Sequence, residues 1–204
     1  MSATNLLIVF YSSTGANYQM AQWAEEGAKS TGANVKLTRF PETAPKEAIS
    51  SNPAWEKNVE NIKDVPEVIL DDLEWAEGII FSAPTRYGST PSQVQSFLDT
   101  TGGLWFSGKL LNKVVSAMTS AQNPHGGQES TILAIYKNMC HWGAIIVAPG
   151  YSDKVTFSSG GNPYGTSTTV DQSGKILDDI EEGVKHQAKR TVEIASLIHR
   201  KQRF

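Results

Sequence analysis

Short apolar stretches alternate with amphipathic stretches along most of the chain. The apolar ones are Leu6–Tyr11, Val35–Phe40, Gly78–Ala83, Lys113–Ser120 and Ala144–Ala148. Each is only a few residues long and rich in Val, Ile or Phe. Strands of a parallel sheet have this composition because helices cover both of their faces. We therefore expect five buried strands.

The stretches between and after these strands carry apolar residues at helical spacing. We expect helices at Asn17–Thr31, Ser92–Thr101, Gln128–Trp142 and Leu177–Lys201. Gly32 is a typical residue after a helix, and Pro91 is a typical residue at a helix start. Repeated alternation of strand and helix predicts an α/β fold: a doubly wound, five-stranded parallel sheet with helices on both faces and inserted loops.

Two segments do not follow this alternation. Residues 41–66 are polar and interrupted by prolines, and a short helix is the only regular element expected there. Residues 150–174 are rich in Gly, Ser and Thr. Long loops of this kind in a compact domain are usually functional or disordered. No repeat and no domain boundary is visible, so a single domain over residues 1–204 is expected.

Composition narrows the classes of function. The 204 residues carry a net charge of −3, whereas a general nucleic-acid-binding protein needs a basic face. Cys140 is the one cysteine, which rules out an internal disulfide and fits a reducing compartment. The first apolar run is too short for a membrane span and lacks the basic start of a signal peptide. We expect a cytoplasmic protein without nucleic-acid or membrane partners.

The segment Ser12–Asn17, with sequence SSTGAN, directly follows the first predicted strand and opens the first helix. In open α/β sheets ligands bind at this position, beyond the carboxyl end of a strand. A helix N-terminus offers unpaired N–H groups and partial positive charge. Hydroxyl groups and the Asn17 amide add donors, and Gly15 lets the backbone come close to a ligand. These features suit a phosphate.

The loop differs from the common nucleotide-binding patterns. It lacks the lysine of a P-loop, since the first lysine is Lys29, and it lacks GxGxxG. A terminal monophosphate held without a cationic side chain fits better. The loop alone supports an ordinary capped helix equally well, because Ser and Thr are common caps.

Other chemistries lack their signatures. There is no GxSxG nucleophile elbow, no CxxC or HExxH metal motif, and no phosphatase-type CxxxxxR near the first strand. We therefore assign no catalytic side chain and no metal ligand.

Several motifs, taken in order, resemble one family. Ser12–Asn17 is similar to the phosphate loop of flavodoxin-like proteins that bind flavin mononucleotide (FMN). The remaining motifs are PET at Pro41–Thr43, PTRYG at Pro84–Gly88, TGGLW at Thr101–Trp105, GGQE at Gly126–Glu129 and GGNPYG at Gly160–Gly165. Together they resemble the WrbA family of flavodoxin-like NAD(P)H:quinone oxidoreductases (type IV). The resemblance extends over nearly the whole chain.

The resemblance implies an FMN site and names its residues. The predicted FMN contacts are Ser12, Ser13, Thr14, Gly15, Ala16, Asn17, Pro84, Thr85, Arg86, Tyr87, Gly88, Ser120, Ala121, Gln122, Gly126 and His141; Trp105 is predicted to face the substrate, commonly from a neighbouring subunit. Structural alternatives are a surface ion pair for Arg86, simple packing for Tyr87, a helix C-terminal cation for His141, and a buried anchor for Trp105. Ala121 replaces a family threonine, and about two extra residues follow it, which leaves the contacts of residues 122–125 open.

The resemblance also implies an activity. Hydride would pass from NAD(P)H through FMN to a quinone at one shared pocket, in a ping-pong cycle, within a homotetramer built as a dimer of dimers. A flavodoxin-type electron carrier, an FMN-dependent azo or flavin reductase, and a protein-interaction role are the alternatives.

Overall fold

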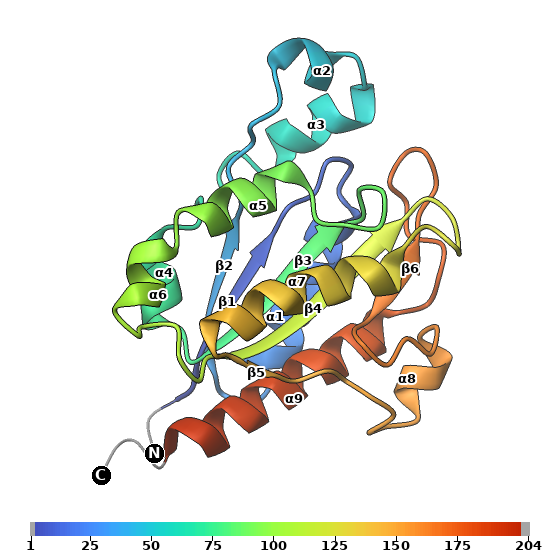
Figure 1. Ribbon diagram of the computed structural model, residues 1–204. Helices are drawn as coiled ribbons and strands as arrows, with labels where there is room; N and C mark the ends of the chain where they lie inside the picture. The colour runs from blue at the N-terminus through green and yellow to red at the C-terminus, as the bar shows by residue number, and fades with distance from the viewer. Residues whose placement is uncertain (1–2, 201–204) are drawn as a thin grey trace.

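The computed structural model describes residues 3–200 and contains the expected parallel sheet. Its main path has the strand order β2-β1-β3-β4-β5, as Figure 1 shows. The strands are β1 Asn5–Phe10, β2 Asn34–Arg39, β3 Gly78–Pro84, β4 Val114–Ala121, β5 Ile145–Ile146 and β6 Ser167–Thr169. The predicted doubly wound α/β architecture is confirmed.

The edge next to β4 differs from the prediction, because it consists of two short strands. β5 pairs only with Val114 and Val115 at the start of β4. β6 pairs in parallel with Thr119–Ala121 at its end. Val147 and Thr166 still bond to the backbone of β4, and residues 148–165 connect the two strands. The polar sequence of β6, Ser-Thr-Thr, has no apolar run, so hydrophobic patterning does not reveal it.

The helices include more elements than the sequence pattern predicted. They are α1 Ala16–Lys29, α2 Lys46–Ser50, α3 Pro53–Asn61, α4 Leu70–Trp75, α5 Ser92–Asp99, α6 Gly102–Phe106, α7 Gln128–Trp142, α8 Val155–Ser158 and α9 Glu181–Arg200. The last helix starts later than expected, because Leu177 N–H and the Asp178 carboxylate are bonded to β6 instead. Its predicted end at Lys201 lies outside the described residues. None of the helices within residues 3–200 has the length and apolarity needed to cross a bilayer.

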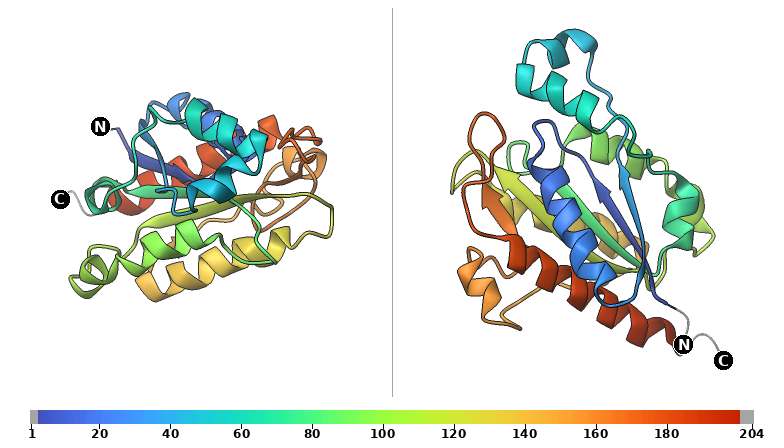
Figure 2. Two further views of the ribbon diagram at one scale, coloured as in Figure 1. Left: turned by 90° about the horizontal axis from the view of Figure 1, so that it is seen from above. Right: turned by 180° about the vertical axis from the view of Figure 1, so that it is seen from behind.

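Each face of the sheet is covered by its own helices, as Figure 2 shows. Along β1, Leu6, Ile8 and Phe10 face a core that includes α1 and α9. The alternate residues Leu7 and Val9 face a core that includes α4, α5 and α7. This alternation follows from the pleat of a strand. Burial on both faces explains why these strands have continuous apolar sequences.

The register of the sheet determines where the loops meet. Phe10 of β1 lies beside Ser82 of β3, and Pro84 of β3 lies beside Ser120 of β4. The carboxyl ends of these three strands therefore lie together at one end of the sheet. The α2–α3 segment projects from the same end of the molecule (Figure 1).

Candidate functional site

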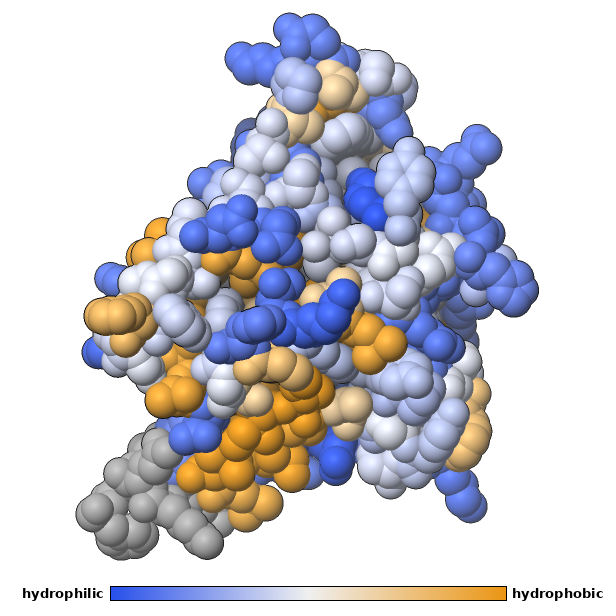
Figure 3. Space-filling view, viewed as in Figure 1, coloured by the Kyte–Doolittle hydropathy of each residue, from blue (hydrophilic) through white to orange (hydrophobic). Residues whose placement is uncertain are grey.

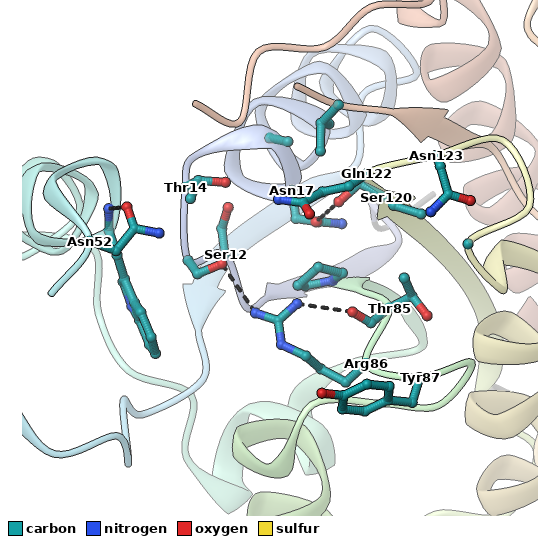
Figure 4. A pocket seen from close by; sticks show the side chains of 17 residues that line it. Ser12, Thr14, Asn17, Asn52, Thr85, Arg86, Tyr87, Ser120, Gln122 and Asn123 are labelled. Atoms are coloured by element: carbon teal, nitrogen blue, oxygen red, sulfur yellow. Dashed lines mark hydrogen bonds between the residues drawn. The ribbon is translucent and has the colours of Figure 1, made fainter. Parts of the chain in front are cut away.

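A cavity of about 500 Å³ opens at the carboxyl ends of β1, β3 and β4. Its walls come from the loops after these strands and from α3, as Figure 4 shows. The lining residues are Ser12, Ser13, Thr14, Ala16, Asn17, Asn52, Trp55, Pro84, Thr85, Arg86, Tyr87, Ser120, Ala121, Gln122, Asn123, Gly126 and Val170. Arg86 is the one charged residue among them. The volume lies in the range of small-molecule and cofactor sites.

The loop before α1 leaves the helix N-terminus open. Gly15 has a φ of 103°, and no side chain caps the helix. The Gly15 N–H donates to Ser12 Oγ at 3.0 Å. Within residues 3–200, the N–H groups of Thr14, Ala16 and Asn17 have no acceptor. The capped-helix alternative is therefore not observed, and the loop presents unpaired donors to the cavity.

Asn17 lines the cavity and also has hydrogen-bond partners that the sequence did not predict. It is buried, and its side-chain amide donates to Ser82 Oγ at 3.1 Å. Its side-chain oxygen accepts from Ser120 Oγ at 2.6 Å. The side chain therefore joins the start of α1 to the ends of β3 and β4, and its amide nitrogen donates to Ser82 and Met20 within the chain. These partners are distant in sequence, so the local motif could not reveal them.

The loop after β3 brings Arg86 across the cavity, as Figure 4 shows. Its guanidinium donates to Ser13 Oγ at 3.2 Å and to the Thr85 carbonyl at 2.9 Å. No carboxylate of the described residues pairs with it, so the predicted alternative of a surface ion pair is not observed.

Tyr87 is fully exposed at the rim of the cavity and has a φ of 52°. This conformation is unfavourable for a residue with a side chain. The packing alternative for Tyr87 is therefore not observed either. Gly88 follows it and lies so close to Gly127 that a Cβ on Gly127 would meet Gly88 Cα at 2.7 Å. The loops after β3 and β4 thus depend on glycine for their contact.

Asn123 organises the loop after β4. Its carbonyl accepts from Gln128 Nε2 and from the Gly126 N–H, and its side chain accepts from the His125 N–H. Gln122, Asn123 and Gly126 line the cavity, whereas His125 lines a separate surface hollow. The sequence left the contacts of residues 122–125 open. In the structure the start of this loop lies at the cavity, and its middle does not.

The segment between β2 and α4 contributes residues that the sequence analysis missed. Asn58 of α3 is buried and donates to the Ser12 carbonyl at 2.7 Å. Asn52 caps α3 by accepting from the N–H groups of Ala54 and Trp55. The Asn-Pro pair at the start of α3 is a recognisable cap followed by Pro at N1. That signal could have located the helix, but not its contact with the Ser12–Asn17 loop.

Glu42 joins this segment to the sheet. Its carboxylate accepts from Tyr11 Oη at 3.0 Å, from Trp55 Nε1 at 3.1 Å and from Gln93 Nε2 at 2.7 Å. Burial, together with the nearby Glu42 charge, raises the pKa of Tyr11. The Tyr11 hydroxyl therefore stays protonated and remains a donor to Glu42.

Trp105 and His141 lie together, but outside the cavity. Trp105 Nε1 donates to the His141 carbonyl at 2.9 Å, and both side chains are exposed. The buried-anchor alternative for Trp105 is therefore not observed. His141 is in the last turn of α7, and Gln128 at the other end of that helix lines the hollow next to the loop after β4. Thirteen residues of helix span roughly 20 Å. Neither predicted residue reaches the cavity of its own chain.

The cavity fits FMN by its donor set and its walls. The unpaired N–H groups and the hydroxyls of Ser13 and Thr14 suit a phosphate ester, because negative charge is favoured at a helix N-terminus. Pro84, Ala121 and Val170 supply apolar surface beyond the phosphate loop. A flat ring requires such surface.

Comparisons with known proteins agree with this fit. The model of the family described as NADPH-dependent FMN reductase matches residues 6–154. A relative from Deinococcus radiodurans, named NAD(P)H dehydrogenase (quinone), is 52% identical over 94% of this chain and 95% of its own. Another with that name, from Syntrophobacter fumaroxidans, is 40% identical over 96% and 98%. A flavodoxin, WrbA-like protein from Agrobacterium tumefaciens has a similar fold, with a TM-score of 0.70, 19% identity, and coverage of 96% and 99%.

Proposed function

The chain belongs to the NADPH-dependent FMN reductase family, and on that premise we propose that it is an FMN-dependent NAD(P)H dehydrogenase that reduces quinones by two electrons. One observation supports this most: the uncapped start of α1, with three unpaired N–H groups, opens into a cavity of about 500 Å³. The names of relatives at 52% and 40% identity agree with the proposed activity.

The proposed FMN site divides into a phosphate end and a ring end. Backbone N–H groups of Ser12–Asn17 and the hydroxyls of Ser13 and Thr14 hold the phosphate. The ring end is formed by Pro84–Gly88 and by Ser120, Ala121, Gln122 and Gly126. When bound, FMN supplies the chemistry of accepting a hydride and passing two electrons to the second substrate.

The protein's own residues bind, orient and shield the reactants. Exposed Tyr87 offers a flat face beside the ring end, where planar nicotinamide and quinone rings can stack. The Arg86 guanidinium favours negative charge on ligands in the cavity. No side chain acts as a nucleophile or as a metal ligand in this proposal.

We propose that the active form is a homotetramer, a dimer of dimers, in the cytoplasm. Trp105 and Phe106 of α6 are 55% and 87% exposed, which leaves apolar surface for a second chain to cover. Further apolar surface gathers around β5 and the C-terminal part of α9, as Figure 3 shows. In such an assembly the Trp105–His141 pair of one chain could approach the cavity of its neighbour, which would explain their distance from their own.

Two anaerobic half-reactions test the activity. Adding NADH or NADPH to the FMN-loaded protein should bleach the flavin absorbance in the visible range. Adding benzoquinone should then restore it. Steady-state double-reciprocal plots for the two substrates should be parallel, because both use one pocket in turn. Intersecting lines would contradict the shared pocket.

The same experiment separates the enzyme from a flavodoxin-type carrier. A carrier receives electrons from a protein partner, so NAD(P)H alone would leave its absorbance unchanged. Replacing benzoquinone by an azo dye or by free flavin distinguishes the related reductases. The proposed enzyme should turn over the quinone fastest.

A further inference from the structure

The inserted segment places a single aromatic side chain at the cavity wall. Trp55 is the only aromatic residue within residues 41–66. It is half-buried and lines the cavity together with Asn52. It does not belong to any of the loops that carry the proposed FMN contacts.

A hydrogen bond to Glu42 fixes the Trp55 side chain. Its Nε1 donates to Glu42, whose carboxylate is fixed by further donors from Tyr11, directly after β1, and Gln93 of α5. A carboxylate with donors from three parts of the chain has little freedom to move. An indole fixed in this way, yet not buried in the core, provides a flat surface to a ligand at low entropic cost.

The position of Trp55 shows which part of a ligand could reach it. In the sheet, β2 lies beside β1 on the side away from β3 and β4, and Trp55 follows β2 in the chain. Figure 4 shows Asn52 at one end of the cavity and Gln122 and Asn123 at the other, with Ser12 and Thr14 between them. A mononucleotide held by the Ser12–Asn17 loop ends at that loop. A ligand that reaches Trp55 must extend beyond it.

Polar groups along this path suit the adenosine diphosphate part of a dinucleotide. Arg86 spans the cavity at Ser13 and suits a pyrophosphate. The Asn52 side-chain oxygen is used in capping α3, whereas its amide nitrogen has no acceptor within residues 3–200. That free donor lies next to Trp55 and can meet a ribose hydroxyl or a purine nitrogen.

We propose that Trp55 is the stacking surface for the adenine ring of NAD(P)H, that Asn52 and Arg86 contact the same half of the dinucleotide, and that Glu42 is the positioning residue for Trp55. This inference rests on the proposed function. It adds a binding site for the half of the donor that takes no part in the reaction.

A truncated donor provides the test. Reduced nicotinamide mononucleotide lacks the adenosine half but carries the same reacting ring. Trp55→Leu should lower kcat/KM for NADH by roughly tenfold, because stacking of a base on an aromatic side chain contributes on the order of tenfold or more in affinity. The same variant should leave kcat/KM for the mononucleotide, the KM for benzoquinone and the dissociation constant of FMN unchanged. Trp55→Phe should retain most of the wild-type behaviour.

An equilibrium measurement gives a readout without turnover. ADP-ribose should bind the FMN-loaded protein in calorimetry, and Trp55→Leu should weaken that binding by a similar factor. Glu42→Gln should produce the same selective loss, with activity toward the mononucleotide retained. Glu60→Ala is the matched control and should have no effect, because among the described residues this exposed α3 carboxylate pairs with Lys63 alone.

Two results would overturn the inference. One is equal loss with NADH and with the mononucleotide, which would place Trp55 at the nicotinamide or in the general fold. The other is unchanged binding of ADP-ribose by Trp55→Leu. The proposed function fails separately, if wild-type protein does not pass electrons from NAD(P)H to benzoquinone.

Discussion

At the scale of single residues, one buried hydrogen bond connects the phosphate loop to the inserted segment. Asn58 Nδ2 donates to the Ser12 carbonyl at 2.7 Å, and Asn58 is 5% exposed. Ser12 Oγ in turn accepts from the Gly15 N–H, so Ser12 is held through both its carbonyl and its side chain. Its expected contribution is to the shape of the loop, since no atom of Asn58 lines the cavity.

Replacing Asn58 should therefore weaken binding of FMN through its phosphate. We expect Asn58→Ala to raise the FMN dissociation constant about fivefold, because losing a hydrogen bond of this kind costs on the order of 1 kcal/mol. Riboflavin, which lacks the phosphate, is the matched ligand. Its affinity should not change. Fluorescence titration measures both, and equal loss for the two ligands would contradict this role.

Burial of Tyr136 predicts a dependence of stability on pH. Burial raises its pKa to about 12, and its hydroxyl donates to the Tyr164 carbonyl and accepts from the Ala117 N–H. The folded state therefore holds this proton more tightly than the unfolded state. The resulting stabilisation is complete below pH 10 and is lost as pH rises towards 12.

This shift predicts that Tyr136→Phe is destabilising and that the loss shrinks above pH 10. At neutral pH the free energy of unfolding should fall by about 1–3 kcal/mol, because Ala117 N–H and Tyr164 C=O lose a partner. Urea unfolding at pH 7 and at pH 11 measures the difference. A loss that stays constant over this range would contradict the raised pKa.

Local sequence predicted some site residues and missed others for a physical reason. Ser13, Thr14 and Arg86 belong to contiguous loops at strand ends, and all three line the cavity. Asn52 and Trp55 enter it only through the packing of α3, which depends on contacts distant in sequence. The roles of His141 and Trp105 stay predictions, since neither residue lines the cavity of the described chain.

At the scale of elements, the loop after β6 packs against the Ser12–Asn17 loop. Gly174 has a φ of 87°, and a Cβ there would meet the Thr14 carbonyl oxygen at 2.3 Å. Gly32, at the end of α1, has a similar φ of 81° but open space around it. A comparison of the two positions therefore distinguishes the cost of backbone strain from the cost of a steric clash with Thr14.

Gly174→Ala should consequently damage the site more than Gly32→Ala does. Both variants acquire backbone strain of roughly 1–2 kcal/mol. Only Gly174→Ala should also displace Thr14, because the new Cβ would clash with the Thr14 backbone. Since Thr14 belongs to the proposed phosphate site, this displacement should weaken FMN binding by more than about tenfold. Thermal melts and FMN titrations of both variants check this. Similar FMN affinity in the two variants would contradict the contact.

Long apolar elements were predictable, and short polar ones were not. Three of the five apolar runs, those of β1, β3 and β4, are strands with both faces buried, and that burial requires the composition that was recognised. β2 is also a full strand, but it lies at the edge of the sheet and is only partly buried. β5 retains only Ile145–Ile146, and β6 is held by backbone pairing with Thr119–Ala121. Backbone pairing leaves no hydrophobic pattern in the sequence.

At the scale of the whole molecule, the proposed tetramer requires that α6 be covered. Phe106 is 87% exposed in the single chain, and it directly follows Trp105, which is predicted to face the site of a neighbouring chain. Burying a charge in an interface without a partner is costly. Phe106→Asp should therefore reduce the assembly to dimers or monomers in sedimentation equilibrium. Leu177→Asp, at an exposed position beside β6, is the control that should not. An unchanged mass for Phe106→Asp would contradict an interface at α6.

The central claim is that backbone N–H groups and hydroxyls at the start of α1 bind the phosphate of FMN. Calorimetric titration of the flavin-free protein with FMN and with riboflavin tests it most directly. We predict that FMN binds at least about 100-fold more tightly, because hydrogen bonds to a charged group each contribute roughly 1.5–3 kcal/mol. Equal affinities for the two flavins would contradict the claim.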